Sequence, residues 1–179
     1  VLDSVSKNSL FHANGPIAQN MLNRLTQVVP GTKAPNFYLL NDSKDTLTLL
    51  DFRGKYLYIQ FVDPESARTK FEMDPLIKLH NSYKDYIQFI TVLSTTDANM
   101  IQTEVFNSIP WQVFGVDVGN KFLINYHIAT FPSYVLIDNQ GYIVSIPALG
   151  PLPNGLYETI EKTFFYIKKM IENSEKEKH

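Results

Sequence analysis

The chain has 179 residues, of which 44% are hydrophobic, 13% aromatic and 19% charged, the composition of a single globular domain with a sizeable core. Its 16 basic and 18 acidic residues give a net charge of -2, which argues against a protein that binds nucleic acid. The chain contains no cysteine, so disulfides, thiolate metal sites and a cysteine nucleophile are excluded within it.

The sequence predicts no membrane span, no metal site and no cofactor. No apolar run approaches the roughly 18 residues needed to cross a bilayer, and the first ten residues lack the pattern of a signal peptide. Because the chain does not begin with Met, we expect it to derive from a longer precursor. The histidines are scattered without the spacing of metal ligands: they are His12, His80, His127 and His179.

In chain order, the first predicted elements are a helix and a hairpin. Residues 16–28 carry an apolar stripe that stops at Pro30 and Gly31, which indicates an amphipathic helix. We interpret residues 1–30 as a helical extension at the end of an upstream region. Residues 34–55 read as two short strands joined by a polar turn, an N-terminal hairpin.

The next segment predicts a strand, a helix and a second strand. Residues 56–62 are almost entirely β-branched or aromatic, as in a strand covered on both faces. Asp63 would then cap a helix, with Pro64 and Glu65 in its first turn, that runs to about Tyr83. Residues 86–94 form another buried strand, so the fold class is α/β with a right-handed crossover.

The remaining elements complete one domain over residues 31–173. The patterns predict a helix over 96–108, an extended piece over 111–117, a short helix over 120–128 and a hairpin that turns at Gly141. A last amphipathic helix covers 156–176, and residues 174–179 are expected to be a solvated tail. The apolar face of that helix consists of Leu156, Ile160, Phe164, Ile167 and Ile171.

Several motifs in this order resemble the thioredoxin-like superfamily, and within it the TlpA-like periplasmic thiol-disulfide oxidoreductases. They are "GTKAPNFYLLN", "TLLDFRGKYLYIQF", "FEMDPL" and "NYHIATFPSYVLIDNQGYIV", and the resemblance as a whole runs over about residues 30–171. The resemblance implies a thioredoxin-like fold, a central mixed sheet flanked by helices, with an N-terminal hairpin and helix added. It also implies a cis peptide bond before Pro132 and a location in the periplasm or cell envelope.

On that pattern, Ser66 and Thr69 occupy the two positions of the family's Cys-x-x-Cys pair, with Ala67 and Arg68 between them. A hydroxyl can neither form a disulfide nor act as a thiolate, so the resemblance implies a site that has lost its redox activity. The candidate binding residues are Pro132, Phe131, Trp111 and Arg68. The aromatic residues would either line a peptide groove or fill the core.

Other chemistries find weaker support. Ser66 and Thr69 can serve as hydrogen-bonding groups at the helix start, whereas a serine nucleophile needs a base, and His80 lies three to four turns along the same helix. Acidic residues could form an acid–base cluster, but capping alone would place carboxylates at a helix start: they are Asp63, Glu65 and Glu72.

The favoured hypothesis is a thioredoxin-like domain that lacks the redox pair and serves as a non-catalytic binding or structural module of a larger envelope protein. Its partner would be an extended peptide or a protein, without membrane insertion of this segment. The alternative is a thiol-disulfide oxidoreductase whose active cysteines lie outside these residues or were substituted.

Overall fold

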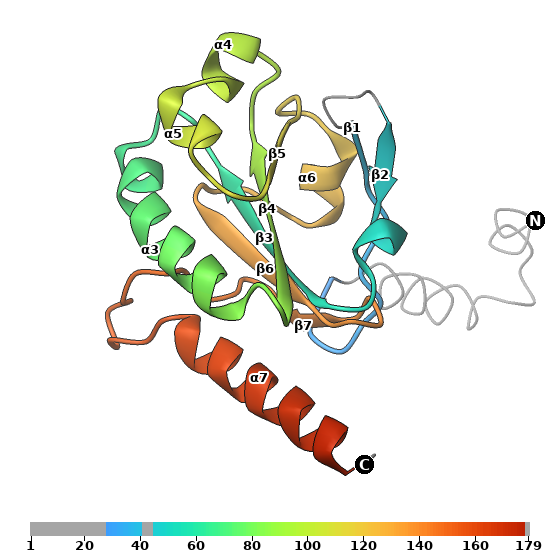
Figure 1. The fold of residues 1–179 in the computed structure, drawn as a ribbon. Coiled ribbons are helices and arrows are strands. Elements are labelled where there is room, and N and C mark those ends of the chain that lie inside the picture. Colours follow the sequence, from blue (N-terminus) through green and yellow to red (C-terminus); the bar gives the residue numbers. More distant parts are fainter. Residues whose placement is uncertain (1–27, 41–44, 178–179) are drawn as a thin grey trace, which may run out of the picture.

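The computed structural model describes residues 28–40 and 45–177. Almost all of the predicted N-terminal helix lies outside the described residues, as do the turn of the first hairpin and residues 178–179. Figure 1 shows the chain from its hairpin to its final helix.

A five-stranded mixed sheet forms the centre of the fold, in the order β5-β4-β3-β6-β7. The strands β3, β4 and β5 are parallel, whereas β6 runs antiparallel to β3, and β7 runs antiparallel to β6. All seven residues of β3 are buried, which confirms the central strand predicted from its apolar run. The strand bounds are β3 Tyr56–Val62, β4 Ile87–Leu93, β5 Gln112–Gly115, β6 Ser133–Ile137 and β7 Ile143–Ser145.

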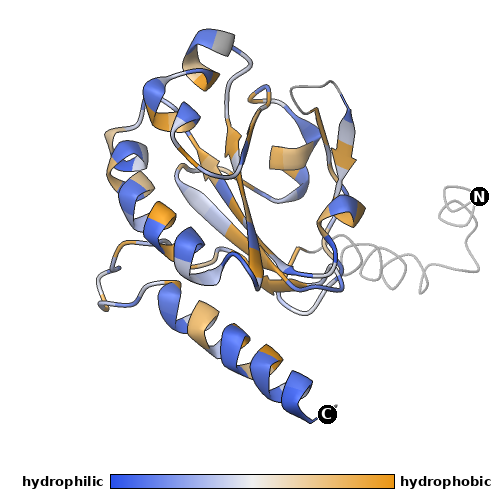
Figure 2. Ribbon diagram, in the orientation of Figure 1, coloured by the Kyte–Doolittle hydropathy of each residue, from blue (hydrophilic) through white to orange (hydrophobic). Residues whose placement is uncertain are grey.

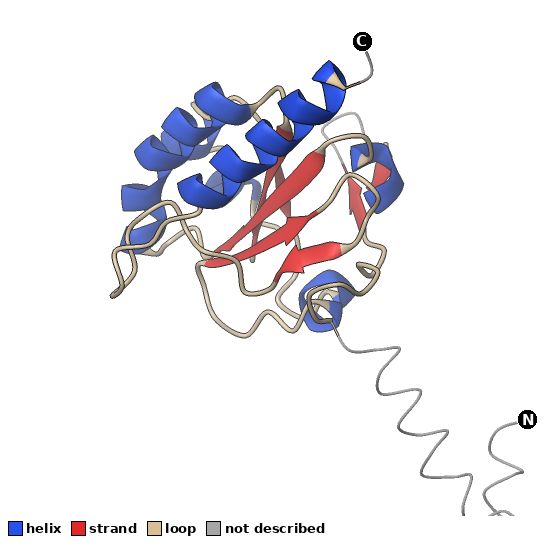
Figure 3. Ribbon diagram, turned by 90° about the horizontal axis from the view of Figure 1, so that it is seen from below, coloured by secondary structure: helices blue, strands red, loops and turns tan. Residues whose placement is uncertain are grey.

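Each face of the sheet has its own hydrophobic core. Helices α3 (Ala67–Tyr83) and α7 (Glu161–Lys176) cover one face, and the core beneath them includes Leu76 and Phe164. The other core includes Leu39 of the hairpin and Phe122 of α6. Figure 3 shows α3 and α7 on the same side of the strands, and Figure 2 shows apolar residues concentrated in the central strands. The second layer comprises β1 Tyr38–Leu40, β2 Thr46–Thr48, η1 Leu49–Phe52 and α6 Lys121–Asn125.

The predicted helix over residues 96–108 is two short helices. They are α4, Ala98–Ile101, and α5, Glu104–Asn107. Thr103 separates them because its backbone is extended, with φ -76° and ψ 157°, and it serves as the N-cap of α5. A continuous helical periodicity in the sequence therefore conceals a break.

The final helix begins later than predicted and ends at the predicted residue, Lys176. Asn154 organises a turn, since its Oδ1 accepts hydrogen bonds from the backbone N–H groups of Leu156 and Glu158. Leu156 is 77% exposed and lies outside α7, so it does not belong to the buried face. The helix continues to Lys176, and the first residues of the predicted tail are therefore helical. No described helix is both long and apolar enough to cross a membrane.

Candidate functional site

The corner between β3 and α3 differs from the prediction in where the helix starts. The helix begins at Ala67, with Ser66 as its N-cap, rather than with Asp63. Asp63 instead organises a turn: its Oδ1 accepts a hydrogen bond from the N–H of Glu65 at 2.9 Å, and its carbonyl accepts one from the N–H of Ser66 at 3.2 Å. Consequently no acidic residue occupies the first turn of α3.

The two hydroxyls of the degenerate motif have different surroundings. Thr69 is fully buried, and its Oγ1 donates a hydrogen bond to the carbonyl of Asp63 at 3.0 Å. Ser66 is half-buried, and its side chain makes no capping hydrogen bond. Thr69 therefore ties the helix start to the preceding turn, while Ser66 caps the helix through its backbone alone.

A buried carboxylate lies one turn further along α3. Glu72 is 0% exposed. Its Oε1 accepts a hydrogen bond from Nε of Arg68 at 2.9 Å, and its Oε2 accepts one from the hydroxyl of Tyr134 on β6. A buried charge without partners is strongly destabilising. Arg68 and Tyr134 together supply the partners that make this position tolerable.

This pair continues into a chain of side-chain hydrogen bonds across the sheet. Gln60 Nε2 donates to the Tyr134 hydroxyl at 3.4 Å, and Thr91 Oγ1 donates to Gln60 Oε1 at 3.0 Å. Trp111 Nε1 donates to Thr91 Oγ1 at 2.9 Å. Gln60 is directly paired in the sheet with both Thr91 and Tyr134. The strand register therefore places these three side chains next to one another on β4, β3 and β6.

Burial also raises the pKa of the tyrosines in and beside this hydrogen-bonded series. Burial, followed by the hydrogen bond to Glu72 and its negative charge, raises the pKa of Tyr134 far above the ordinary value of a phenol. Tyr58 stacks on Tyr134 with ring centroids 5.4 Å apart, and its pKa is also raised, again mainly by burial. Both phenols therefore remain protonated donors at physiological pH.

The segment before β6 lies beside the corner. Phe61 is paired with Ser133, which places Pro132 across from the end of β3. The Phe131–Pro132 peptide bond is cis, as is Ile146–Pro147. Within the described part of the chain, the backbone N–H and C=O of Phe131 form no hydrogen bond. Its ring packs partly against the core on the hairpin side of the sheet.

Trp111 does not join the corner. It directly precedes β5 and so lies at the N-terminal end of the parallel strands, whereas the corner follows the C-terminal end of β3. Its ring packs against those of His80 and Phe89, at centroid distances of 5.2 and 5.4 Å. Phe114 and Tyr134 are buried in the two cores. Of the two aromatic candidate binding residues, Phe131 lies at the corner and Trp111 does not.

His80 gives this region a predicted pH dependence. Burial, helped by the charge of Lys84, lowers the pKa of His80 below its ordinary value of 6.5. On acidification the unfolded chain takes up this proton at a higher pH than the folded chain does. The contribution of neutral His80 to the free energy of unfolding is therefore fully present above about pH 6.5 and is lost as the pH falls below that value. We expect the melting temperature to fall less between pH 7.5 and pH 5 in His80→Gln than in the native chain. Equal pH dependence in thermal melts would contradict this assignment.

The acid–base and metal alternatives gain no support from the geometry. Asp63 and Glu65 lie in the turn before the helix, whereas Glu72 lies within the helix, buried and bound to Arg68. His80 lies 14 residues after Ser66, most of that along one helix, or about 20 Å, which is too far for a general base. Among residues 28–40 and 45–177, no group of three or more His, Asp or Glu side chains gathers to hold a metal.

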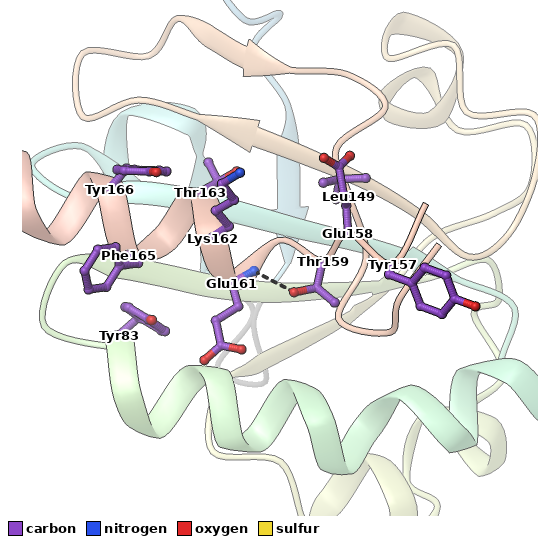
Figure 4. Close-up of a pocket in the computed structure, with 10 residues that line it drawn as sticks. All are labelled: Tyr83, Leu149, Tyr157, Glu158, Thr159, Glu161, Lys162, Thr163, Phe165 and Tyr166. Carbon is purple, nitrogen blue, oxygen red and sulfur yellow. Dashed lines mark hydrogen bonds between the residues drawn. The ribbon is translucent and has the colours of Figure 1, made fainter. Parts of the chain in front are cut away.

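A pocket of about 720 Å³ opens elsewhere, between the start of α7 and the end of α3. Figure 4 shows its lining, in which the N–H of Glu161 donates a hydrogen bond to Thr159 Oγ1. It mixes aromatic rings with charges of both signs, without a nucleophile and base in hydrogen-bonding contact. Its wall includes Tyr83, Tyr157, Glu161, Lys162, Phe165 and Tyr166.

Sequence reasoning missed Gln60, Thr91 and the structural role of Glu72. The first two could have been noticed as polar residues inside otherwise apolar strands, "YLYIQFV" and "IQFITVL". A polar side chain in a strand buried on both faces needs a partner, which is a signal for a hydrogen-bonded network.

Comparison with solved structures decides the fold. The thioredoxin domain of a thiol-disulfide oxidoreductase from Bacteroides vulgatus superposes with a TM-score of 0.63 at 20% identity, covering 80% of this chain and 99% of that one. A thiol:disulfide interchange protein from Bacteroides sp. gives 0.64 at 20% identity, covering 79% and 90%. The chain has the thioredoxin-like fold.

Other likenesses agree with this fold. A thioredoxin-like protein from Bacteroides caccae matches the domain with a TM-score of 0.61 at 16% identity, over 94% of this chain and 60% of that chain. Two proteins named thiol-disulfide oxidoreductase ResA, from Bacillus thuringiensis (strain Al Hakam) and Bacillus anthracis, are 24% identical over 115 residues. That match covers 64% of this chain and 66% of theirs, just under two thirds of their length. No protein-family model matches the chain.

The thioredoxin-like domain therefore keeps the strand-to-helix corner of a thiol-disulfide oxidoreductase fold without its sulfur atoms. The sequence Ser66-Ala67-Arg68-Thr69 stands in place of the Cys-x-x-Cys motif, and the chain has no cysteine at all. Hydroxyls at these positions cannot exchange disulfides.

Proposed function

We propose that this thioredoxin-like domain is a non-catalytic module that binds an extended peptide of a partner protein beside Pro132. The observation that carries the proposal is an intact corner, with free backbone groups at Phe131, in a chain without a sulfur nucleophile. By resemblance to the TlpA-like branch, the module would act in the periplasm or cell envelope as part of a larger protein.

The environments of the two hydroxyls support a non-catalytic role. The Thr69 hydroxyl is buried and bonded to the backbone, so it is not available to a substrate. The Ser66 hydroxyl forms no hydrogen bond with a carboxylate or an imidazole among the described residues, and Glu72 is bound to Arg68 and Tyr134. An unactivated serine hydroxyl is a weak nucleophile.

The unpaired backbone groups at the corner support peptide binding. The N–H and C=O of Phe131 can pair with an extended peptide in the manner of an added β-strand. A hollow of about 310 Å³ lies on one side of this segment, bordered by Ile128, Thr130 and Ser133. Another, of about 430 Å³ and mostly apolar, lies on the far side of the corner, bordered by Pro64 and Phe106.

A peptide-display library of 12-residue random sequences tests the proposal. Binders selected on the full chain are expected to slow hydrogen–deuterium exchange at residues 130–133. The variant Tyr166→Phe is the control and is expected to bind them with unchanged affinity, because Tyr166 is an exposed residue of α7, away from the corner. A library that yields no binder, or binders that protect only segments remote from Pro132, would contradict the proposal.

A further inference from the structure

We propose that Arg68 selects a carboxylate in the bound peptide, so that the preferred partner carries an acidic side chain or a free C-terminus over the start of α3. This inference rests on the proposed peptide-binding function and names the chemistry of the partner. The charge of Arg68 is partly exposed, although its counter-ion Glu72 is buried.

The guanidinium of Arg68 has donors to spare. Only its Nε is used, in the 2.9 Å bond to Glu72, and its two Nη groups make no hydrogen bond within the described residues. The Arg68 side chain is 65% exposed and that of Glu72 is 0% exposed. The pair is thus oriented with its positive end toward solvent, and a guanidinium edge matches a carboxylate in geometry as well as in charge.

Glu72 links Arg68 to β6, the strand that begins directly after Pro132. The second oxygen of Glu72 accepts the hydroxyl of Tyr134, which lies two residues after Pro132 on β6. Lys70, in contrast, borders the hollow formed with Pro64 and Phe106. Two exposed cations of one helical turn therefore have different neighbours: Lys70 lines that hollow, whereas Arg68 is bonded to the carboxylate that contacts β6.

The position of Arg68 is held by the core. Its partner Glu72 is fixed through Tyr134 to Gln60, and Gln60 is bonded to Thr91 two strands away from β6. A side chain that is already ordered loses less conformational entropy when it binds. This arrangement distinguishes Arg68 from a lysine or arginine that moves freely on a surface.

Two neighbouring carboxylates limit where the acidic group can lie. Asp63 and Glu65 precede the helix, and neither forms an ion pair with Arg68 among the described residues. They would repel an acidic residue placed over the turn. The preference for a carboxylate should therefore apply to one position of the peptide rather than to acidic peptides in general.

The test uses a peptide selected from the library above, resynthesised with Glu, Gln or Lys at each position in turn, and with a free or amidated C-terminus. We expect one position at which Glu binds about threefold to tenfold more tightly than Gln, and this difference should shrink as salt is raised. If the free C-terminus gives the gain instead, the carboxylate is terminal. Arg68→Glu is expected to reverse the preference at that position toward Lys.

Matched variants separate selection from folding. Lys78→Gln removes an exposed charge further along the same helix, away from the corner, and should leave the Glu-over-Gln ratio unchanged. The double variant Arg68→Gln/Glu72→Gln removes both charges, so no buried carboxylate is left without its counter-ion. It should bind Glu and Gln peptides equally. If peptides bind at Phe131 but every position tolerates Gln, or if Arg68 variants keep the preference, Arg68 is not the selector and the proposed function stands. If no peptide binds beside Pro132, both fail together.

Discussion

Replacing Glu72 by alanine is expected to lower the free energy of unfolding by about 3 kcal/mol, a large effect for a charged residue. The change leaves the Tyr134 hydroxyl with Gln60, 3.4 Å away, as its only side-chain partner, and it opens a cavity behind α3. Urea denaturation measures the loss as a lower midpoint with an unchanged slope. The expected loss for Asp74→Ala, an exposed carboxylate on the same helix, is below about 0.5 kcal/mol.

A second substitution separates the lost bonds from the lost charge. Glu72→Met with Tyr134→Phe removes the carboxylate and the hydroxyl together while nearly conserving volume, and it should recover most of the stability that Glu72→Ala loses. If Glu72→Ala costs less than about 1 kcal/mol, the buried carboxylate is not held as the geometry indicates. In that case Arg68 would also lack a rigid support.

Restoring the sulfur pair with Ser66→Cys and Thr69→Cys is expected to convert an inactive chain into one that reduces insulin in the presence of dithiothreitol. The native chain should show no turnover above background, because it has no thiol. In the double variant the spacing at a helix start suits disulfide geometry. Native turnover, in a preparation of verified mass, would overturn the non-catalytic proposal.

The reactivity of the first thiol depends on the helix start. The first turn of α3 contains no acidic residue, so its positive end is not neutralised from within the helix. We expect the Ser66→Cys thiol to have a pKa between about 7 and 8, below the ordinary 8.5, with Glu65→Gln lowering it further. Ser82→Cys, near the other end of the same helix, should stay at or above about 8.5. Alkylation rates against pH measure both values, and equal midpoints would refute the role of the helix.

The helix start shows where local patterns reach their limit. The apolar run of β3 and the end of α3 at Tyr83 were predicted correctly, because both depend on short-range composition. Asp63 was expected to cap the helix, and it caps a turn instead. A side chain of this kind can satisfy either set of N–H groups. Which set it takes depends on the backbone that follows Pro64.

Part of the candidate site could also be predicted from the sequence, and part of it could not. Pro132, Phe131 and the Ser66–Thr69 motif could be selected from sequence, because the motifs of a known superfamily contain them. Trp111 lies at the other end of the sheet from them, and residue type does not reveal at which end of a strand a side chain lies. The hydrogen-bonded chain was not foreseen, although the polar residues inside apolar strands were visible.

Two properties of the protein follow from its amino-acid sequence alone: an α/β arrangement around one buried strand, and the absence of thiol chemistry, since a missing sulfur atom needs no structure to establish. The tertiary structure alone decided the environment of Glu72. Its partner Tyr134 is 62 residues away in the chain, and Gln60 is 74 residues from Tyr134. Contacts of such range depend on which strands pair and in what register, and one residue of slip would turn each side chain to the opposite face of the sheet.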